Sequence, residues 1–261
     1  MAERISAPLG SGRARYAPGV PALTDRAHTE LRDWFSDHPD SYVAVSGGKD
    51  SMVSLHLAAA VQPGVRAVWF DSRLEFPQTR PYLERMCAAW GTPLTVIEAE
   101  QDPLDLMVEN GTWSTWTEND LSDPDAVSRA TMVEPLRKAQ ETISRASVYG
   151  MRADESVQRK MLYAKNNGRA TVTVKGVVVQ HYFAPIWRWS FAQVMAYAAM
   201  NRVELHPLYA AQERLGVRYP RMGTVIDATG LERGRWFVAR QLAPDLARRI
   251  EARLPRLAED R

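Results

Sequence analysis

Residues 46–51, which read Ser-Gly-Gly-Lys-Asp-Ser, combine the groups that a polyphosphate needs. Several backbone amides must lie close to the anion, and side chains at Gly47 and Gly48 would hold the backbone away from it. Ser46 and Ser51 add hydroxyl donors. We therefore predict that this segment binds the phosphates of a nucleotide.

The remaining two residues of the segment indicate the kind of phosphate ligand. Lys49 supplies a positive charge that can neutralise phosphate oxygens. Asp50 would repel those oxygens unless a divalent cation lay between the two negative groups. We therefore predict magnesium, with Asp50 as a metal ligand. The segment is not a Walker A loop, which has four residues between its glycines and ends in Gly-Lys-Ser/Thr.

The flanking residues predict how this segment is held. Residues 41–45 are typical of a buried strand, whereas apolar residues recur at helical spacing over 52–57. A helix beginning near Asp50 would aim its free amides and the positive end of its dipole at an anion. The other interpretation is a tight turn before a surface helix.

Apolar, β-rich runs alternate with helical periodicity along most of the chain, which predicts an α/β fold with a doubly wound parallel sheet. Residues 170–174 and 177–180 flank a Lys-Gly pair and have the alternation of a small β-hairpin. The further expected strands are 65–70, 94–97 and 147–149, and the expected helices are 27–36, 76–90, 133–143 and 157–164.

The chain has 261 residues and a formal net charge of +2, too balanced for the whole surface to bind nucleic acid. We expect a flexible arm over 1–25, one domain over 26–225 and a C-terminal helical segment over 226–261. Cys87 is the sole cysteine, which excludes an internal disulfide, a cysteine-ligated iron–sulfur cluster and a Cys-rich zinc site. No stretch is apolar enough for a signal peptide or a membrane span, so we expect a soluble, cytoplasmic protein.

Two segments could face a second substrate. Residues 101–130 are acidic, contain Trp113 and Trp116, and predict either a lid over an acceptor or a tryptophan-anchored surface loop. Residues 150–175 contain six basic and two acidic residues. That local charge could bind an anionic acceptor such as nucleic acid, and a solvated helix face with one phosphate-binding arginine explains it equally well.

The 46–51 segment resembles the pyrophosphate-binding loop, Ser-Gly-Gly-x-Asp-Ser, of the PP-loop ATP pyrophosphatases. From Tyr42 to about Met222 the chain further resembles the phosphoadenosine phosphosulfate (PAPS) reductase family, because five short motifs follow in that family's order. These are Phe-Pro-Gln-Thr at 76–79, Val-Glu-Pro-Leu at 133–136, Gly-Met-Arg-Ala-Asp-Glu-Ser at 150–156, His-Pro-Leu-Tyr at 206–209 and Tyr-Pro-Arg-Met-Gly at 219–223.

The resemblance implies a five-stranded parallel sheet of the adenine nucleotide alpha-hydrolase type, with the nucleotide at the carboxyl ends of the strands. Asp71, at the end of the second strand, would then lie near the nucleotide. Arg152 would reach the phosphates from the opposite side, where its planar guanidinium can hold two oxygens. In the superfamily the loop grips the β and γ phosphates of ATP while an acceptor attacks the α phosphate.

The chain differs from the reductases of this family in residues that would carry out the reaction or bind the nucleotide. These reductases use a nucleophilic cysteine near the C-terminus, and many carry further cysteine pairs where this chain has Ala130-Thr131 and Gly223-Thr224. Cys87 lies on the apolar side of a predicted helix, which favours a core residue over a sulfur carrier. Lys49 and Asp50 differ from the reductases' version of the loop and suit magnesium-bound ATP.

These observations predict an ATP pyrophosphatase that adenylates an acceptor, with Lys49, Asp50 and Arg152 as catalytic residues. The acceptor would be a nucleic acid or nucleotide receiving sulfur or nitrogen, and sulfur would come from a donor protein. The competing interpretations are a nucleotide-binding regulatory subunit without turnover and a PAPS reductase that borrows a thiol. A small-metabolite acceptor also stays open.

Overall fold

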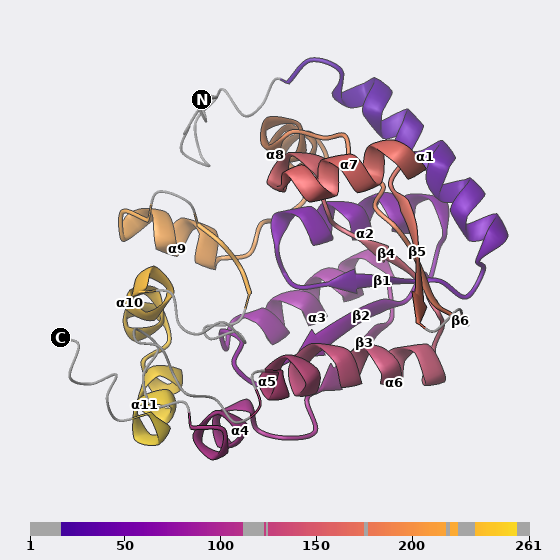
Figure 1. The fold of residues 1–261 in the computed structure, drawn as a ribbon. Helices are drawn as coiled ribbons and strands as arrows, with labels where there is room; N and C mark the ends of the chain where they lie inside the picture. The colour runs from indigo at the N-terminus through magenta and orange to yellow at the C-terminus, as the bar shows by residue number, and fades with distance from the viewer. Residues whose placement is uncertain are drawn as a thin grey trace.

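A six-stranded sheet forms the centre of the computed structural model, which describes residues 17–111, 123, 125–174, 177–217, 220–223 and 233–254. The strands run in the order β3-β2-β1-β4-β6-β5 (Figure 1). Their bounds are β1 Tyr42–Val45, β2 Ala67–Asp71, β3 Leu94–Glu98, β4 Ala146–Tyr149, β5 Arg169–Val174 and β6 Val177–Phe183.

Five of these strands are mutually parallel, as predicted, and β5 alone runs antiparallel. The expected hairpin is part of the sheet and not an appendage to it. Its second strand continues to Phe183, and His181 pairs with Ala146 of β4. The hairpin therefore supplies the fifth parallel strand and one antiparallel edge strand.

Side chains of β1 alternate between two cores, as the pleat of a strand requires. Val43 and Val45 pack in the larger core, to which α1, α2, α3 and α8 contribute, whereas Tyr42 and Ala44 pack on the opposite face. There α6 closes the core through Ala139. The helices are α1 Val20–Asp37, α2 Lys49–Val61, α3 Thr79–Trp90, α6 Glu134–Thr142, α7 Val157–Asn166 and α8 Phe191–Met200.

The first helix begins earlier than the pattern predicted. α1 starts at Val20 rather than residue 27, so the end of the segment expected to be a flexible arm is helical. Gly19 precedes it with a positive φ of 83°, and Pro21 occupies its first turn, where a missing N–H costs nothing. Residues 1–16 lie outside the described part of the chain.

The acidic insertion contains more regular structure than the sequence indicated. α4 spans Pro103–Glu109, and Asp102 caps it by accepting a hydrogen bond from the Leu104 amide. The short α5, Ala126–Ser128, runs through a π-helical turn, Arg129–Val133, into α6. Trp113 and Trp116 lie outside the described residues, so the predicted lid remains a prediction.

Within the predicted C-terminal helical segment, the described residues 233–254 form two helices. α10 spans Arg233–Leu242 and α11 spans Pro244–Arg253. Pro244 ends the hydrogen-bond ladder because it has no N–H. Trp236 and Ile250 pack with Phe76 in a core separate from those on the two sheet faces. α9, Leu208–Arg214, lies beside α10 in Figure 1. No described helix is long and apolar enough to cross a membrane.

Candidate functional site

The 46–51 loop turns sharply between β1 and α2, as predicted. Gly47 adopts a positive φ of 73°, a conformation that glycine enters without a steric penalty. A Cβ atom at this position would lie 3.1 Å from the imidazole of His206. Gly48 is the N-cap residue, and α2 begins at Lys49. The loop therefore keeps its backbone clear of side chains and places the start of a helix at the carboxyl end of the central strand.

The two serine hydroxyls hold the loop in shape. Ser51 Oγ accepts a hydrogen bond from the Ser46 amide at 3.2 Å and donates one to the Gly48 carbonyl at 2.9 Å. The two hydroxyl oxygens lie 3.3 Å apart. Because Ser51 is buried, its hydroxyl braces the backbone that would cradle an anion.

A carboxylate with a cation on each side follows the glycines. Asp50 Oδ2 lies 2.5 Å from Lys49 Nζ, and Asp50 Oδ1 lies 2.8 Å from Arg152 Nε. The Arg152 side chain is only 7% exposed. The structure thus brings together the three residues predicted to be catalytic, although Arg152 is about a hundred positions away in the chain.

Arg152 is held in place from its other side as well. Asp154 accepts bonds from Arg152 Nη1 at 2.6 and 2.7 Å, and Glu155 Oε1 lies 3.7 Å from Nη2. These acidic residues sit on the single 3₁₀ turn Ala153–Glu155. The guanidinium is therefore oriented before any ligand arrives, which lowers the entropy cost of binding an anion.

Gly150 explains how β4 reaches the loop. A Cβ atom at Gly150 would lie 2.4 Å from the amide nitrogen of Ser51, a distance that no side chain tolerates. Glycine is therefore required where the end of β4 passes the first turn of α2. Gly150 is the first residue of the 150–156 motif, but the motif did not indicate this role. The signal that could have found it was a glycine immediately after a predicted strand.

The His-Pro-Leu-Tyr turn contacts the loop, another feature that the sequence pattern did not predict. The hydroxyl of Tyr209 accepts a hydrogen bond from the Lys49 amide at 3.0 Å. Burial raises the pKa of this phenol, so it remains protonated. Lys49 Nζ also lies 5.3 Å from the centroid of the Phe191 ring. Tyr209 and Phe191 therefore position the first residue of α2.

His206 forms the floor beneath Gly47. Its Nδ1 accepts a hydrogen bond from the Leu208 amide at 3.2 Å, and its ring lies 4.7 Å from that of Tyr82. Burial, followed by the nearby Arg85 charge, lowers the pKa of His206 to about 4. The imidazole is therefore neutral at physiological pH. Its hydrogen bond to the Leu208 amide stabilises the turn.

His206 should make the stability of the protein depend on pH. In the unfolded chain the imidazole takes up a proton below about pH 6.5, whereas in the folded protein it does so near pH 4. The free energy of unfolding should therefore fall as the pH drops from 6.5 towards 4. Between pH 7 and 4.5 we expect wild type to lose about 2 kcal/mol more than His206→Asn. Urea unfolding measures both, and equal losses would contradict this assignment.

Asp71 lies at the same edge of the sheet as the loop. Val45 pairs with Trp69, so Asp71 extends two residues further along β2, past the end of β1. Its carboxylate accepts a hydrogen bond from the Arg73 amide at 2.8 Å, and burial raises its pKa. Among the described contacts none joins Asp71 to the loop, and its predicted place beside the nucleotide stays a prediction.

Residues 40–229 match the phosphoadenosine phosphosulfate reductase domain family. The chain belongs to this family. A PAPS reductase from a Synechococcus strain is 24% identical over 190 residues, which are 72% of this chain and 77% of that protein.

Two solved structures share the fold. The phosphate complex of PAPS reductase from Candida auris superposes with a TM-score of 0.54 and 21% identity, covering 80% of this chain and 96% of that one. FMN adenylyltransferase from Candida glabrata in complex with ATP gives 0.51 and 15% identity, covering 83% and 68%. The predicted fold class is thereby confirmed.

This member of the PAPS reductase domain family has one cysteine, and the fold buries it. Cys87 is 2% exposed and packs in the larger core. Burial raises the pKa of its thiol, so the reactive thiolate is disfavoured. The prediction that Cys87 is a core residue agrees with this position. The sulfur nucleophile of a reductase is therefore missing from this chain.

The residues of this family member fit a magnesium-bound triphosphate. The two glycines leave the loop amides without side chains of their own beside them, and Lys49 and Arg152 provide positive charge next to the loop. Both Asp50 oxygens already contact those cations, so a metal ion bound here would displace one of the contacts. No group of three or more His, Cys, Asp or Glu in the described part of the chain could hold a metal. Magnesium would therefore be held by Asp50, phosphate oxygens and water, its usual manner beside nucleotides.

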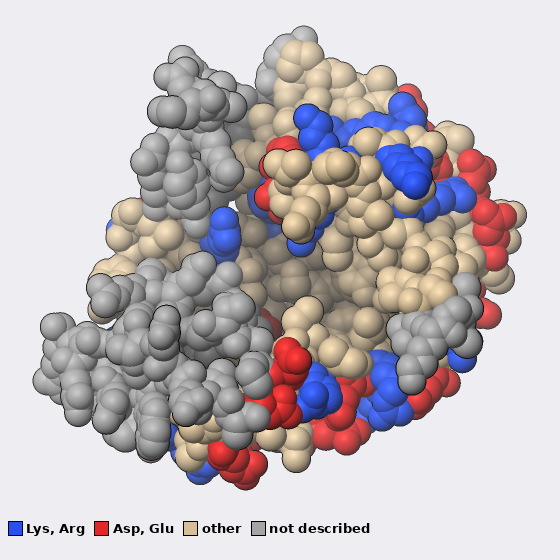
Figure 2. Space-filling view, in the orientation of Figure 1, with Lys and Arg blue, Asp and Glu red and all other residues tan. Residues whose placement is uncertain are grey.

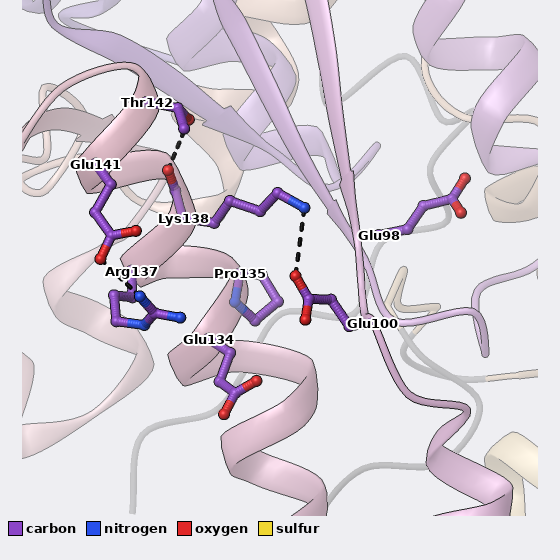
Figure 3. A pocket seen from close by; sticks show the side chains of 8 residues that line it. All are labelled: Glu98, Glu100, Glu134, Pro135, Arg137, Lys138, Glu141 and Thr142. Atoms are coloured by element: carbon purple, nitrogen blue, oxygen red, sulfur yellow. Dashed lines mark hydrogen bonds and ion pairs between the residues drawn. The ribbon is translucent and has the colours of Figure 1, made fainter.

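A separate shallow cavity of about 240 Å³ lies between the end of β3 and α6 (Figure 3). Lys138 points across it to Glu100, at 3.5 Å, while Arg137 pairs with Glu141 along the helix. Because four glutamates outnumber two basic residues in its lining, this cavity disfavours phosphate. The loop site remains the candidate for nucleotide chemistry.

Proposed function

We propose that this chain is an ATP pyrophosphatase, which binds magnesium-bound ATP at the 46–51 loop and adenylates an acceptor with release of pyrophosphate. The acceptor would be a nucleic acid or nucleotide that receives sulfur or nitrogen. The observation that carries the proposal is the Lys49–Asp50–Arg152 cluster beside a glycine loop, in a chain whose only thiol is buried.

The chain's residues would act by positioning and electrostatics. Backbone amides of the loop would hold the β and γ phosphates, and Lys49 and Arg152 would neutralise charge that develops on the departing pyrophosphate. The acceptor's nucleophilic atom would form the new bond to the α phosphorus as the bond between that phosphorus and the bridging oxygen breaks. No side chain need form a covalent intermediate. Bound magnesium would neutralise phosphate charge, with Asp50 as its protein ligand.

The comparisons support ATP as the ligand without identifying the acceptor. FMN adenylyltransferase from Candida glabrata has the same fold, and its crystal structure is a complex with ATP. The name of that protein describes the transfer of an adenylyl group. A donor protein would have to supply any sulfur, because Cys87 is inaccessible.

A reductase is the second candidate, since the family and its Synechococcus relative bear that name. It would require an external thiol in place of the missing cysteine. A nucleotide-binding regulatory subunit is the third candidate. Release of sulfite from PAPS in the presence of thioredoxin would favour the reductase. Tight ATP binding without turnover across a panel of acceptors would favour the regulatory subunit.

ATP–pyrophosphate exchange tests the proposal. The purified chain is incubated with magnesium, ATP and labelled pyrophosphate, alone and with RNA, DNA or metabolite fractions from cells. We expect label to enter ATP only when magnesium and the acceptor fraction are present. Absence of exchange with every fraction, together with sulfite release from PAPS, would refute the proposal.

A further inference from the structure

One part of the sheet face opposite α2 is not covered by a described helix. α6 covers the part formed by β3, β2 and β1 through Ala139, and α7 packs beside β5. Figure 1 shows the strands β4 and β6 between these two helices, and Figure 2 shows a hollow there. Side chains on this face could therefore meet a ligand.

Two half-buried tyrosines on neighbouring strands line this face. Tyr149 ends β4, Tyr182 lies on β6, and their rings meet edge to face with centroids 5.8 Å apart. Gln180 is 5% exposed, and its amide donates hydrogen bonds of 3.1 Å to the Tyr149 hydroxyl and to Ser147 Oγ. Burying an amide costs free energy unless it is hydrogen-bonded. Here that buried amide fixes the orientation of a partly exposed aromatic ring.

The tyrosine pair lies next to the loop site. Tyr149 directly precedes Gly150, whose backbone touches the first turn of α2, and Arg152 follows to contact Asp50. A ring stacked on Tyr149 would therefore lie a few residues' length from the place where the α phosphate of ATP is expected. A nucleic-acid strand bound at the tyrosine pair could therefore extend towards the loop.

The helix beside the pair carries positive charge only. α7 contains Arg159, Lys160 and Lys165 and no acidic residue. Arg159 pairs with Glu155 at 2.5 Å, whereas neither lysine forms an ion pair within the described residues. Figure 2 shows basic side chains over this helix and acidic side chains at its end nearest the hollow. Proteins bind single-stranded nucleic acids by stacking bases on aromatic rings and by placing cationic side chains near the phosphates, and the tyrosine pair and α7 offer both kinds of group.

We propose that the Tyr149–Tyr182 pair is a stacking platform for an unpaired base of a nucleic acid, the base lying on the face of one ring and against the edge of the other, with Lys160 and Lys165 binding its phosphates. This inference rests on the proposed function in one respect: the strand would be the acceptor that is adenylated. The platform assigns a place in the fold to that acceptor and predicts that unpaired strands bind better than duplexes.

Fluorescence anisotropy of the full chain with labelled 15-nucleotide single strands, RNA and DNA, tests the platform. We expect Tyr182→Leu to weaken binding about tenfold or more because a leucine cannot stack, whereas Tyr182→Phe should bind like wild type. Lys160→Ala with Lys165→Ala should weaken binding and flatten its dependence on salt. Lys138→Ala, an exposed lysine of α6, is the matched control and should change neither. ATP affinity, measured alongside, reveals any variant that has lost its fold.

Two results would overturn the platform: no binding of either strand at low salt, or Tyr182→Leu binding as tightly as wild type. The outcomes also separate the platform from the proposed function. Pyrophosphate exchange stimulated by a peptide or metabolite, without strand binding, would leave the function standing and remove the platform. Strand binding that depends on the tyrosines, without pyrophosphate exchange under any condition, would support the platform and refute the proposed function.

Discussion

Replacing Lys49 by alanine should lower magnesium-dependent pyrophosphate release about 100- to 1,000-fold, as does removal of one preorganised charge-stabilising donor in other enzymes. The Lys49 ammonium lies 2.5 Å from Asp50 and its backbone amide is held by Tyr209. This geometry leaves little freedom for another cation to take its place. Pyrophosphate release at saturating ATP, with the acceptor fraction that supports exchange, measures the effect.

The matched control for this variant is Lys138→Ala. Lys138 is also a helical lysine beside a carboxylate, but its side chain is 52% exposed and it lines the separate cavity between β3 and α6. It should retain full activity. Lys49→Arg should recover only part of the rate, because a guanidinium is broader than an ammonium. Activity of Lys49→Ala within threefold of wild type would rule out the proposed role of the loop lysine.

Replacing Arg152 by alanine should damage both stability and activity. Arg152 is buried among Asp50, Asp154 and Glu155, and its removal leaves those carboxylates without their shared partner. Loss of one member of a buried ion pair costs about 3–5 kcal/mol. We expect a decrease near the lower end of that range, because Asp154 and Glu155 are partly exposed and Asp50 retains Lys49. Urea unfolding gives the free energy, and pyrophosphate release should also fall by at least about 100-fold.

A double variant separates these two effects. Asp50→Asn removes one of the carboxylate charges that lose a partner in Arg152→Ala, so the double variant should be more stable than the sum of the single changes indicates. Its activity should stay low, since both charged groups are lost. Arg137→Ala, which breaks an exposed pair with Glu141, should cost at most about 1 kcal/mol. If Arg152→Ala costs no more than that control, Arg152 does not hold the site together.

The loop and the sheet could be predicted because their signals are local. The Ser-Gly-Gly-Lys-Asp-Ser segment carries its own geometry: two glycines, a strand before them and a helix after them. The parallel strands follow from short apolar runs separated by helical periodicity.

Residues that act across the chain could not be predicted in the same way. Tyr209 reaches the Lys49 amide, and His206 fills the space under Gly47, each about 160 positions away. No periodicity in the sequence connects positions so far apart. The only sequence feature that singled out His206 and Tyr209 was the His-Pro-Leu-Tyr motif that resembles the family's. Helix α4 was not predicted for another reason: its apolar residues Leu104 and Met107 pack with the C-terminal helices and not against the sheet. The break at Pro244 did have a local signal, because proline has no N–H to continue a helix.

The amino-acid sequence alone determined the local chemistry of this protein: a glycine turn with a lysine and an aspartate, a parallel α/β sheet, and one cysteine on the apolar side of a helix. The tertiary structure decided which distant groups meet that turn. Arg152 contacts Asp50 because Gly150 lets β4 pass within contact distance of α2, and the hairpin completes the sheet through β6. Such contacts depend on the packing of elements that are far apart in the chain, whereas local sequence patterns indicate only the conformation of neighbouring residues.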